Sequence, residues 1–265
     1  MHPRKGGKKL KNKIVFLDID GTIVNHDKEI PASTIEAVRK LKENGVYVAI
    51  ATGRAPFMYE DIRKKLGIDS YVSFNGQYVV LNGEVVYKNP LPLNRMEELF
   101  ATVKEQGHSI AFMNHLEMRA SRPDDKLAEE AIHSLKFEYP NVDPEFYKKT
   151  EIYQSLLFCQ EEANYKQKYA DLRFIRWHDN SCDVLPDGGS KAVGVEKLIE
   201  ASGLQIEDSF AFGDGLNDLE MIQLVGTGVA MGNAIPELKK VADYVTDDVD
   251  KDGLYKGLVH LGLIN

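Results

Sequence analysis

Short apolar runs alternate with amphipathic stretches at both ends of the chain. Each run is short enough for a buried strand, and each stretch between them carries apolar residues at helical spacing, as Ile35, Val38 and Leu41 do. In the first part, strands are predicted at 13–20, 46–53 and 70–75, helices at 31–45 and 55–67, and a hairpin at 78–87 with its turn at Asn82-Gly83. Such alternation predicts a parallel sheet with helices on both faces.

The same pattern returns near Ser190. There the sequence predicts helices at 190–203, 217–226 and 234–242 and strands at 208–214, 227–232 and 242–248. The intervening hundred residues have a different character, because helices and strands follow one another there without regular alternation. In this part, helices are predicted at 93–107, 124–135 and 161–170, one or two strands at 109–120, and further strands at 152–160, 172–179 and 181–187.

These patterns predict an α/β protein whose core sheet is interrupted by a separate α+β module. We expect a first core segment at 1–83, an inserted module at 84–186 and a second core segment at 187–265. Residues 1–12 are basic and polar, which favours a disordered tail.

Composition narrows the class of protein. The chain is 43% hydrophobic and 28% charged, as in ordinary soluble proteins, and no apolar run approaches the ~20 residues that cross a bilayer. The short apolar run after the basic start does not resemble a secretory signal, so a cytoplasmic location is expected. The net charge of −8 argues against a nucleic-acid surface. Cys159 and Cys182 lack metal-site spacing and are expected to be buried thiols.

Two carboxylates follow the first strand directly. Asp18 and Asp20 precede Gly21 and Thr22, and two bare acids at the end of a buried strand repel each other. A second acidic pair, Asp214 and Asp218, follows the strand at 208–214. In open α/β sheets such strand ends meet at one edge, where Mg²⁺ is the natural partner of clustered carboxylates. A helix cap or turn residue remains the alternative for Asp218 alone.

Positive charge and phosphate-binding groups are predicted at the same edge. Lys191 follows Ser190, the expected N-cap of a helix, although a helix start favours acidic residues. An anion held between this ammonium and the helix N-terminus would explain the position, while a solvated lysine is the plainer alternative. Thr52 and Gly53 end another strand, and their hydroxyl and amide groups can bind phosphate oxygens.

Together these groups describe phosphoryl transfer. Asp18 is expected to attack phosphorus and form an aspartyl phosphate, and Asp20 to protonate the leaving oxygen and later activate water. The magnesium ion, Lys191, Thr52 and the Gly53 amide would stabilise the charge on the transferred group.

Four segments carry a resemblance to a known family. DIDGT at 18–22, ATGR at 51–54, GGSK at 188–191 and GDGLND at 213–218 resemble, in order and spacing, the motifs of haloacid dehalogenase (HAD) superfamily phosphatases. The inserted module resembles the cap of the Cof-type, class IIB subfamily. The resemblance implies a Rossmann-like core, a substrate-selecting cap and hydrolysis of small phosphate monoesters, commonly sugar phosphates.

The resemblance also implies a role for each motif position. Asp18 and Asp214 would be magnesium ligands, Asp20 would add its backbone carbonyl, and Asp218 would hold a metal-bound water or the lysine. Phosphate would be contacted by Thr52, Gly53, Lys191, Asn217 and the backbone amide of Ile19.

Residues of the inserted module are candidates for substrate selection, although each has an ordinary structural explanation in packing, in a turn or on a solvated surface. They are His115, Arg119, Tyr153, Gln154, Trp177, His178 and Asp183.

Two other functions remain open beside the phosphatase. Phosphomannomutases resemble this pattern in core and cap, so a phosphomutase is the first. A non-catalytic protein that binds a phosphometabolite is the second, although a pure binder has no use for both Asp18 and Asp20. The expected partner is a small phosphorylated metabolite, without nucleic acid or membrane, and the expected state is a monomer or weak homodimer.

Overall fold

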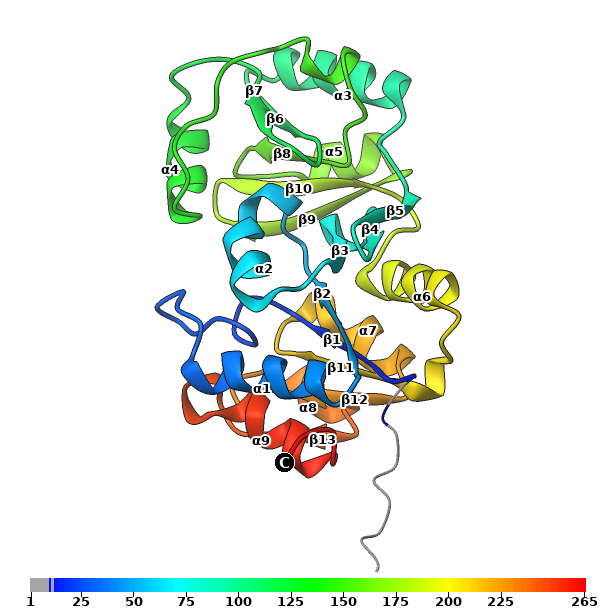
Figure 1. The fold of residues 1–265 in the computed structure, drawn as a ribbon. Coiled ribbons are helices and arrows are strands. Elements are labelled where there is room, and N and C mark those ends of the chain that lie inside the picture. Colours follow the sequence, from blue (N-terminus) through cyan, green and yellow to red (C-terminus); the bar gives the residue numbers. More distant parts are fainter. Residues whose placement is uncertain (1–9, 11) are drawn as a thin grey trace, which may run out of the picture. The chain divides into compact units, whose positions relative to one another are not determined.

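The chain separates into two compact units in the computed structural model, which describes residues 10 and 12–265 (Figure 1). The core unit comprises the described residues up to Gly53 together with Glu60–Tyr87 and Ser190–Asn265. The inserted unit comprises Arg54–Tyr59 and Lys88–Gly189. The predicted disordered tail at 1–12 lies almost wholly outside the described residues.

An eight-stranded sheet forms the centre of the core unit, in the order β13-β12-β11-β1-β2-β3-β4-β5. All pairs from β13 to β3 are parallel, and β3 and β4 are antiparallel. The strands are β1 (Ile14–Leu17), β2 (Tyr47–Ala51), β3 (Ser70–Ser73), β4 (Tyr78–Leu81), β5 (Glu84–Lys88), β11 (Ser209–Gly213), β12 (Thr227–Ala230) and β13 (Tyr244–Val245).

Helices cover both faces of this sheet. One face packs against α6, α7 and α8, and the other packs against α1 and α9, which also contact each other. The α-helices are α1 (Ala32–Glu43), α2 (Glu60–Leu66), α6 (Lys191–Ser202), α7 (Leu219–Leu224), α8 (Pro236–Val241) and α9 (Gly253–His260). The short 3₁₀ helices of this unit are η2 (Phe74–Gly76), η4 (Ile206–Asp208), η5 (Leu216–Asp218) and η6 (Val249–Lys251).

The order of the strands puts a topological switch point beside β1. The chain runs outward from β1 to β2 and β3, then returns after the insertion to β11 on the other side of β1. Leu17 pairs with both Ile50 and Phe212, so the three strands end at the same level. Ligands of open α/β sheets bind in the crevice at such a point.

The central strands are apolar because both faces of the sheet are covered. Every residue of β1 is buried, and Phe16 and Phe212 are fully buried on opposite faces. Burying a side chain of this size contributes roughly 1.5–3 kcal/mol. The predicted α/β class with a parallel-sheet core is therefore confirmed.

The inserted unit has a sheet and a hydrophobic core of its own. Its five strands follow the order β7-β6-β8-β10-β9 with antiparallel pairing. Residues of α3, α5 and one face of the sheet form the core, which includes Phe100, Phe112 and Tyr169. The strands are β6 (Ser109–Met113), β7 (Met118–Ala120), β8 (Gln154–Phe158), β9 (Leu172–His178) and β10 (Ser181–Pro186). The helices are α3 (Leu93–Glu105), α4 (Lys126–Ser134), α5 (Ala163–Lys168), η1 (Pro56–Tyr59) and η3 (Phe146–Lys148).

Two predicted helices begin with a tighter turn than the sequence pattern indicates. The stretch at 55–67 starts as η1, where Met58 N–H donates to Ala55 O at 3.0 Å, and becomes α-helical only at Glu60. The stretch at 217–226 starts as η5, with a 3.2 Å bond from Asp218 N–H to Gly215 O. Hydrophobic periodicity does not distinguish these three-residue turns from α-helix.

We predict that Gly76→Ala destabilises the core unit strongly, because a Cβ at Gly76 would lie 2.0 Å from the carbonyl oxygen of Ser190 and its φ of +99° disfavours any side chain. The free energy of unfolding, measured by urea titration, is expected to fall by more than about 2 kcal/mol.

Gly83→Ala is the matched control. Gly83 has a φ of +83° in the β4–β5 turn, but a Cβ there meets nothing within 4 Å. Its loss should be limited to the left-handed strain of about 1–2 kcal/mol. Equal losses in the two variants would contradict the proposed clash with Ser190.

Candidate active site

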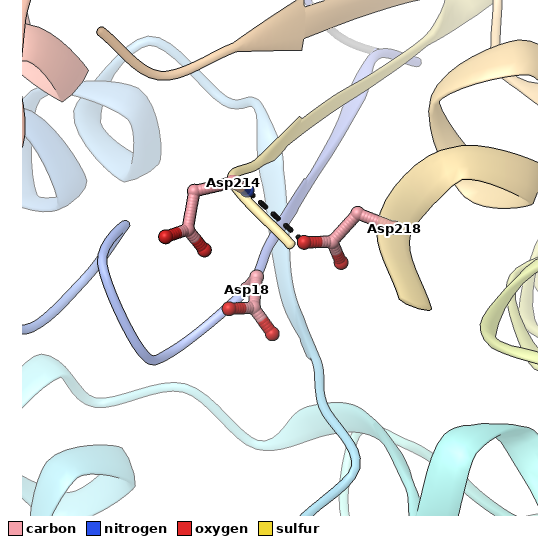
Figure 2. A group of neighbouring side chains, drawn as sticks. All are labelled: Asp18, Asp214 and Asp218. Carbon is pink, nitrogen blue, oxygen red and sulfur yellow. Dashed lines mark hydrogen bonds between the residues drawn. The ribbon is translucent and has the colours of Figure 1, made fainter. Parts of the chain in front are cut away.

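Three aspartates meet where β1 and β11 end. Asp18 follows β1 directly, Asp214 follows β11 directly, and Asp218 closes η5 after the same strand. Each offers a carboxylate oxygen, and these atoms lie within 4.8 Å of one another. Figure 2 shows the three side chains next to one another. The aligned ends of the two neighbouring strands therefore bring Asp18 and the second predicted acidic pair, Asp214 and Asp218, to one edge of the sheet.

Burial makes this group of carboxylates electrostatically costly. Asp18 and Asp218 are almost completely buried. Burial raises the pKa of Asp18 to about 8, although the Lys191 ammonium opposes the rise. Burial, reinforced by the charge of Asp218, raises the pKa of Asp214 to about 6. The site thus gathers more negative charge than its surroundings neutralise, which favours a cation.

Lys191 supplies one positive charge from the first position of α6. The Ser190 hydroxyl caps this helix by accepting from Val193 N–H, so the predicted N-cap is confirmed. The Lys191 Nζ donates to Asp18 Oδ1 at 2.6 Å and to Asp218 Oδ1 at 2.7 Å, and the residue is only 1% exposed. Burial alone would lower the pKa of Lys191, but the two carboxylates outweigh it and raise the pKa.

Asp218 uses both of its carboxylate oxygens within the protein. Its Oδ1 accepts from Lys191, and its Oδ2 accepts from the backbone N–H groups of Asp214 and Gly215, at 3.0 Å each. A Cβ at Gly213 would lie 2.5 Å from Asp218 Cγ, so only glycine allows this approach. Asp218 therefore holds the lysine and shapes the loop after β11.

Asp20 points to a different partner. Its Oδ1 accepts from Lys28 Nζ at 2.6 Å, and both side chains are more than 40% exposed. The turn that carries Asp20 is anchored at Ile19, which is buried and whose carbonyl accepts from the N–H of Val24 at 2.9 Å.

Three of the predicted phosphate-binding residues lie next to Asn75, which belongs to η2 just after β3. The Asn75 N–H donates to Thr52 O at 3.1 Å, and its Oδ1 accepts from Asn217 Nδ2 at 3.2 Å. A Cβ at Gly53 would lie 3.0 Å from the Asn75 amide. Asn75 thus links the segments after β2 and β11.

Three of the candidates in the inserted unit have local partners. Arg119 forms an ion pair with Glu117, and Tyr153 is almost fully buried, with its hydroxyl donating to Glu151 at 2.7 Å. His178 Nδ1 accepts from a backbone N–H two residues on. These contacts support structural roles for the three.

The other candidates lie on neighbouring strands or in the β6–β7 turn. Gln154, Trp177 and Asp183 belong to β8, β9 and β10, which pair side by side, and His115 lies between β6 and β7. The Trp177 Nε1 and the Gln154 Oε1 are buried without a hydrogen bond of normal geometry in the described chain. Their role in substrate selection stays a prediction.

Sequence reasoning missed three residues of the site. Asn75 and Lys28 contact predicted site residues, and Asn233 donates to Asp214 Oδ2 at 3.1 Å. Asn75 had a usable signal, because it follows a strand that ends at the same edge of the sheet. Lys28 and Asn233 lie in turns without any comparable pattern.

We predict that Lys191→Met destabilises the metal-free protein most at high pH. Removing the ammonium leaves the buried carboxylates of Asp18 and Asp218 without their ion-pair partner, which costs about 3–5 kcal/mol. The folded-state pKa of Asp18, about 8, lies above its ordinary value of 3.8, so the folded protein takes up a proton there as the pH falls. The loss should therefore be larger at pH 9 than at pH 6, as urea titrations in EDTA would measure.

Lys197→Met is the control on the same helix. Lys197 forms an exposed ion pair with Glu200 at 2.8 Å, so its loss should change stability by less than about 1 kcal/mol at either pH. A pH-independent loss in Lys191→Met would show that the carboxylates do not cause it.

Comparison with known proteins agrees with the motifs. The family model described as haloacid dehalogenase-like hydrolase matches residues 15–258. YkrA of Bacillus subtilis strain 168 is 50% identical over 256 residues, which cover 96% of this chain and all of that protein.

Solved structures show the same relationship. A hypothetical protein from Geobacillus kaustophilus HTA426 is 56% identical with a TM-score of 0.93, and the match covers 96% of this chain and 100% of that one. BT4131, described as a sugar phosphatase of HAD subclass IIB, is 32% identical with a TM-score of 0.82, covering 95% and 100%. The resemblance read from the four motifs is confirmed, and the chain belongs to the haloacid dehalogenase-like hydrolase family.

Proposed function

We propose that this protein hydrolyses small phosphate monoesters, such as sugar phosphates, in a magnesium-dependent reaction through an aspartyl phosphate on Asp18. The observation that carries the proposal is the position of Asp18 at the switch point of the sheet, next to both Asp214 and Lys191. The description of BT4131 as a sugar phosphatase supports the substrate class. The broader enzyme class, a HAD-type phosphoric monoester hydrolase, follows from the family and its phosphatase members.

The residues of the site fit a magnesium ion. The donors are carboxylate oxygens, which Mg²⁺ prefers, and a divalent cation would offset the burial and the mutual repulsion that raise the pKa of Asp18 and Asp214. Asp18, Asp214 and the backbone carbonyl of Asp20 would hold the ion. Because both oxygens of Asp218 have protein partners, we assign Asp218 to the lysine. When bound, the ion would neutralise charge on the transferred phosphoryl group.

Asp18 and Asp20 carry out the two steps of the proposed reaction. An Asp18 oxygen forms a bond to phosphorus as the ester bond breaks, and Asp20 gives a proton to the departing oxygen. Water then attacks the phosphorus of the aspartyl phosphate, Asp20 takes up a water proton, and phosphate leaves with Asp18 restored. Asp20 must first leave Lys28, and this exposed ion pair is worth less than about 1 kcal/mol.

The remaining site residues position the phosphoryl group. The Lys191 ammonium has three N–H donors, and its bonds to Asp18 and Asp218 use two of them. It can therefore donate to a phosphate oxygen while it stays in the site. The Thr52 hydroxyl, the backbone amides of Ile19 and Gly53, and the Asn217 amide would bind the other oxygens. Asn75 fixes the distance between the segment after β2, which carries Thr52, and the segment after β11, which carries Asn217.

The proposed substrate is a small phosphorylated metabolite. The protein is proposed to act in the cytoplasm as a monomer or weak homodimer. Within residues 12–265, no helix has the length and apolar character needed to cross a membrane. The substrate-selecting role of the module predicted at 84–186, most of which lies in the inserted unit, is part of the proposal.

We predict that Asp18→Asn abolishes phosphate release from p-nitrophenyl phosphate and from a panel of sugar phosphates, because the amide cannot form the covalent intermediate. EDTA should remove the activity of the unmodified protein, and added MgCl₂ should restore it. Asp69→Asn, which changes an exposed aspartate at the opposite end of β3, should retain full activity. Activity in Asp18→Asn equal to that of the control would refute the assignment of the nucleophile.

Product analysis separates hydrolysis from the two other functions. With a hexose 1-phosphate, we expect free phosphate, because water attacks the aspartyl phosphate. Formation of the 6-phosphate isomer would identify a phosphomutase instead. Tight binding of phosphometabolites without release of phosphate from any of them would identify a binding protein.

A further inference from the structure

The side chain of Asn233 joins three segments of the core unit that are far apart in sequence. It lies after β12, and its Nδ2 donates to Gly21 O at 2.9 Å and to Asp214 Oδ2 at 3.1 Å. Its Oδ1 accepts from Val249 N–H, at the start of η6, at 3.0 Å. The two amide hydrogens and the amide oxygen are therefore all used.

The orientation of this amide is determined by its partners. Val249 N–H can only donate, and Gly21 O can only accept, so the oxygen of the Asn233 amide must face Val249 and its nitrogen must face Gly21. A flipped amide would lose both bonds. The second N–H is consequently directed at the Asp214 carboxylate.

Asp214 is confined on this side. A Cβ at Gly21 would lie 2.1 Å from Asp214 Oδ2 and 2.9 Å from Asn233 Nδ2, so the carboxylate packs directly against the turn that follows Asp20. The Nδ2 of Asn233 donates both to that carboxylate oxygen and to the Gly21 carbonyl. It thereby fixes the loop after β11 relative to the loop after β1.

The three clustered carboxylates differ in what orients them. Lys191 forms ion pairs with Asp18 and Asp218, whereas Asp214 is oriented by the neutral amide of Asn233. A neutral donor fixes the direction of a carboxylate without cancelling its charge. This combination suits a carboxylate whose task is to bind a cation, since partners that orient a ligand typically change metal affinity about 10- to 100-fold.

We propose that Asn233 is a positioning residue that presents Asp214 to the magnesium ion and thereby sets the affinity of the site for the metal. The proposal rests on the proposed function, because it takes Asp18 and Asp214 as the residues that hold the ion. Asn233 is not assigned any contact with the substrate or with the reacting atoms. Its loss should weaken metal binding and leave the chemical step at saturating metal nearly unchanged.

The test measures metal binding by two independent readouts in Asn233→Leu, which removes the amide at similar side-chain size. The first is the rise in unfolding temperature of the EDTA-treated protein with MgCl₂ alone, without substrate. The second is the MgCl₂ concentration that gives half-maximal phosphatase activity. In each readout, the MgCl₂ concentration that gives half of the full effect, the magnesium midpoint, is expected to rise about 10- to 100-fold. The kcat at saturating MgCl₂ should stay close to that of the unmodified protein.

Two further variants keep the test decisive. Asn233→Ser replaces the leucine variant if that variant lacks the circular-dichroism spectrum of the unmodified protein, and the same shift is expected. Asn44→Ser is the matched control: it removes a 2.8 Å bond from an asparagine amide to the Leu263 carbonyl elsewhere in the core unit. It should lower stability without moving either magnesium midpoint.

The outcomes distinguish this proposal from the proposed function. Unchanged magnesium midpoints in the Asn233 variants, with an active unmodified protein, overturn only the positioning role. A fall in kcat at saturating MgCl₂ without a shift in the midpoints also overturns it, because Asn233 would then act on the chemical step. An unmodified protein that neither responds to Mg²⁺ nor releases phosphate overturns both proposals.

Discussion

The ammonium of Lys191, buried between Asp18 and Asp218, is the interaction on which the site depends. It connects the start of α6 with the residue after β1 and with the loop after β11. Three carboxylates and one ammonium still leave the site with excess negative charge when all are ionised. A phosphate ester, itself an anion, therefore needs additional positive charge to approach Asp18. The same excess of negative charge that makes this cluster of carboxylates costly gives it affinity for a divalent cation.

The sequence predicted the architecture of the core because the residues that determine it are local. Buried runs such as Ile14–Leu17 mark strands, and the Asn82-Gly83 turn joins β4 and β5 as expected. The parallel register of β1 with its neighbours then places Asp18 beside Asp214 without any further information. Lys191 was identifiable because a lysine at a helix start contradicts the helix dipole.

The contacts that complete the site could not be predicted in this way. Asn233 reaches Asp214 because the chain after β12 folds back over the turn at Gly21, a path that no periodicity encodes. Lys28 approaches Asp20 from a turn in which its own φ is +64°, an uncommon conformation for a lysine. The candidates for substrate selection in the inserted unit pose a related problem. Gln154, Trp177 and Asp183 have side chains suited to binding and to packing alike, and a strand pattern does not separate the two.

The strand order of the core has a consequence for synthesis on the ribosome. β1 is central in the finished sheet, but its neighbour β11 is translated only after the whole inserted unit. At roughly 5–20 residues per second, one edge of β1 lacks its final partner for about ten seconds or more. The inserted unit has its own hydrophobic core and can collapse during this interval. A nascent chain therefore holds Asp18 at an open sheet edge until Lys191 and β11 emerge, and the cluster of Asp18, Asp214 and Asp218 forms only after the inserted unit has been translated.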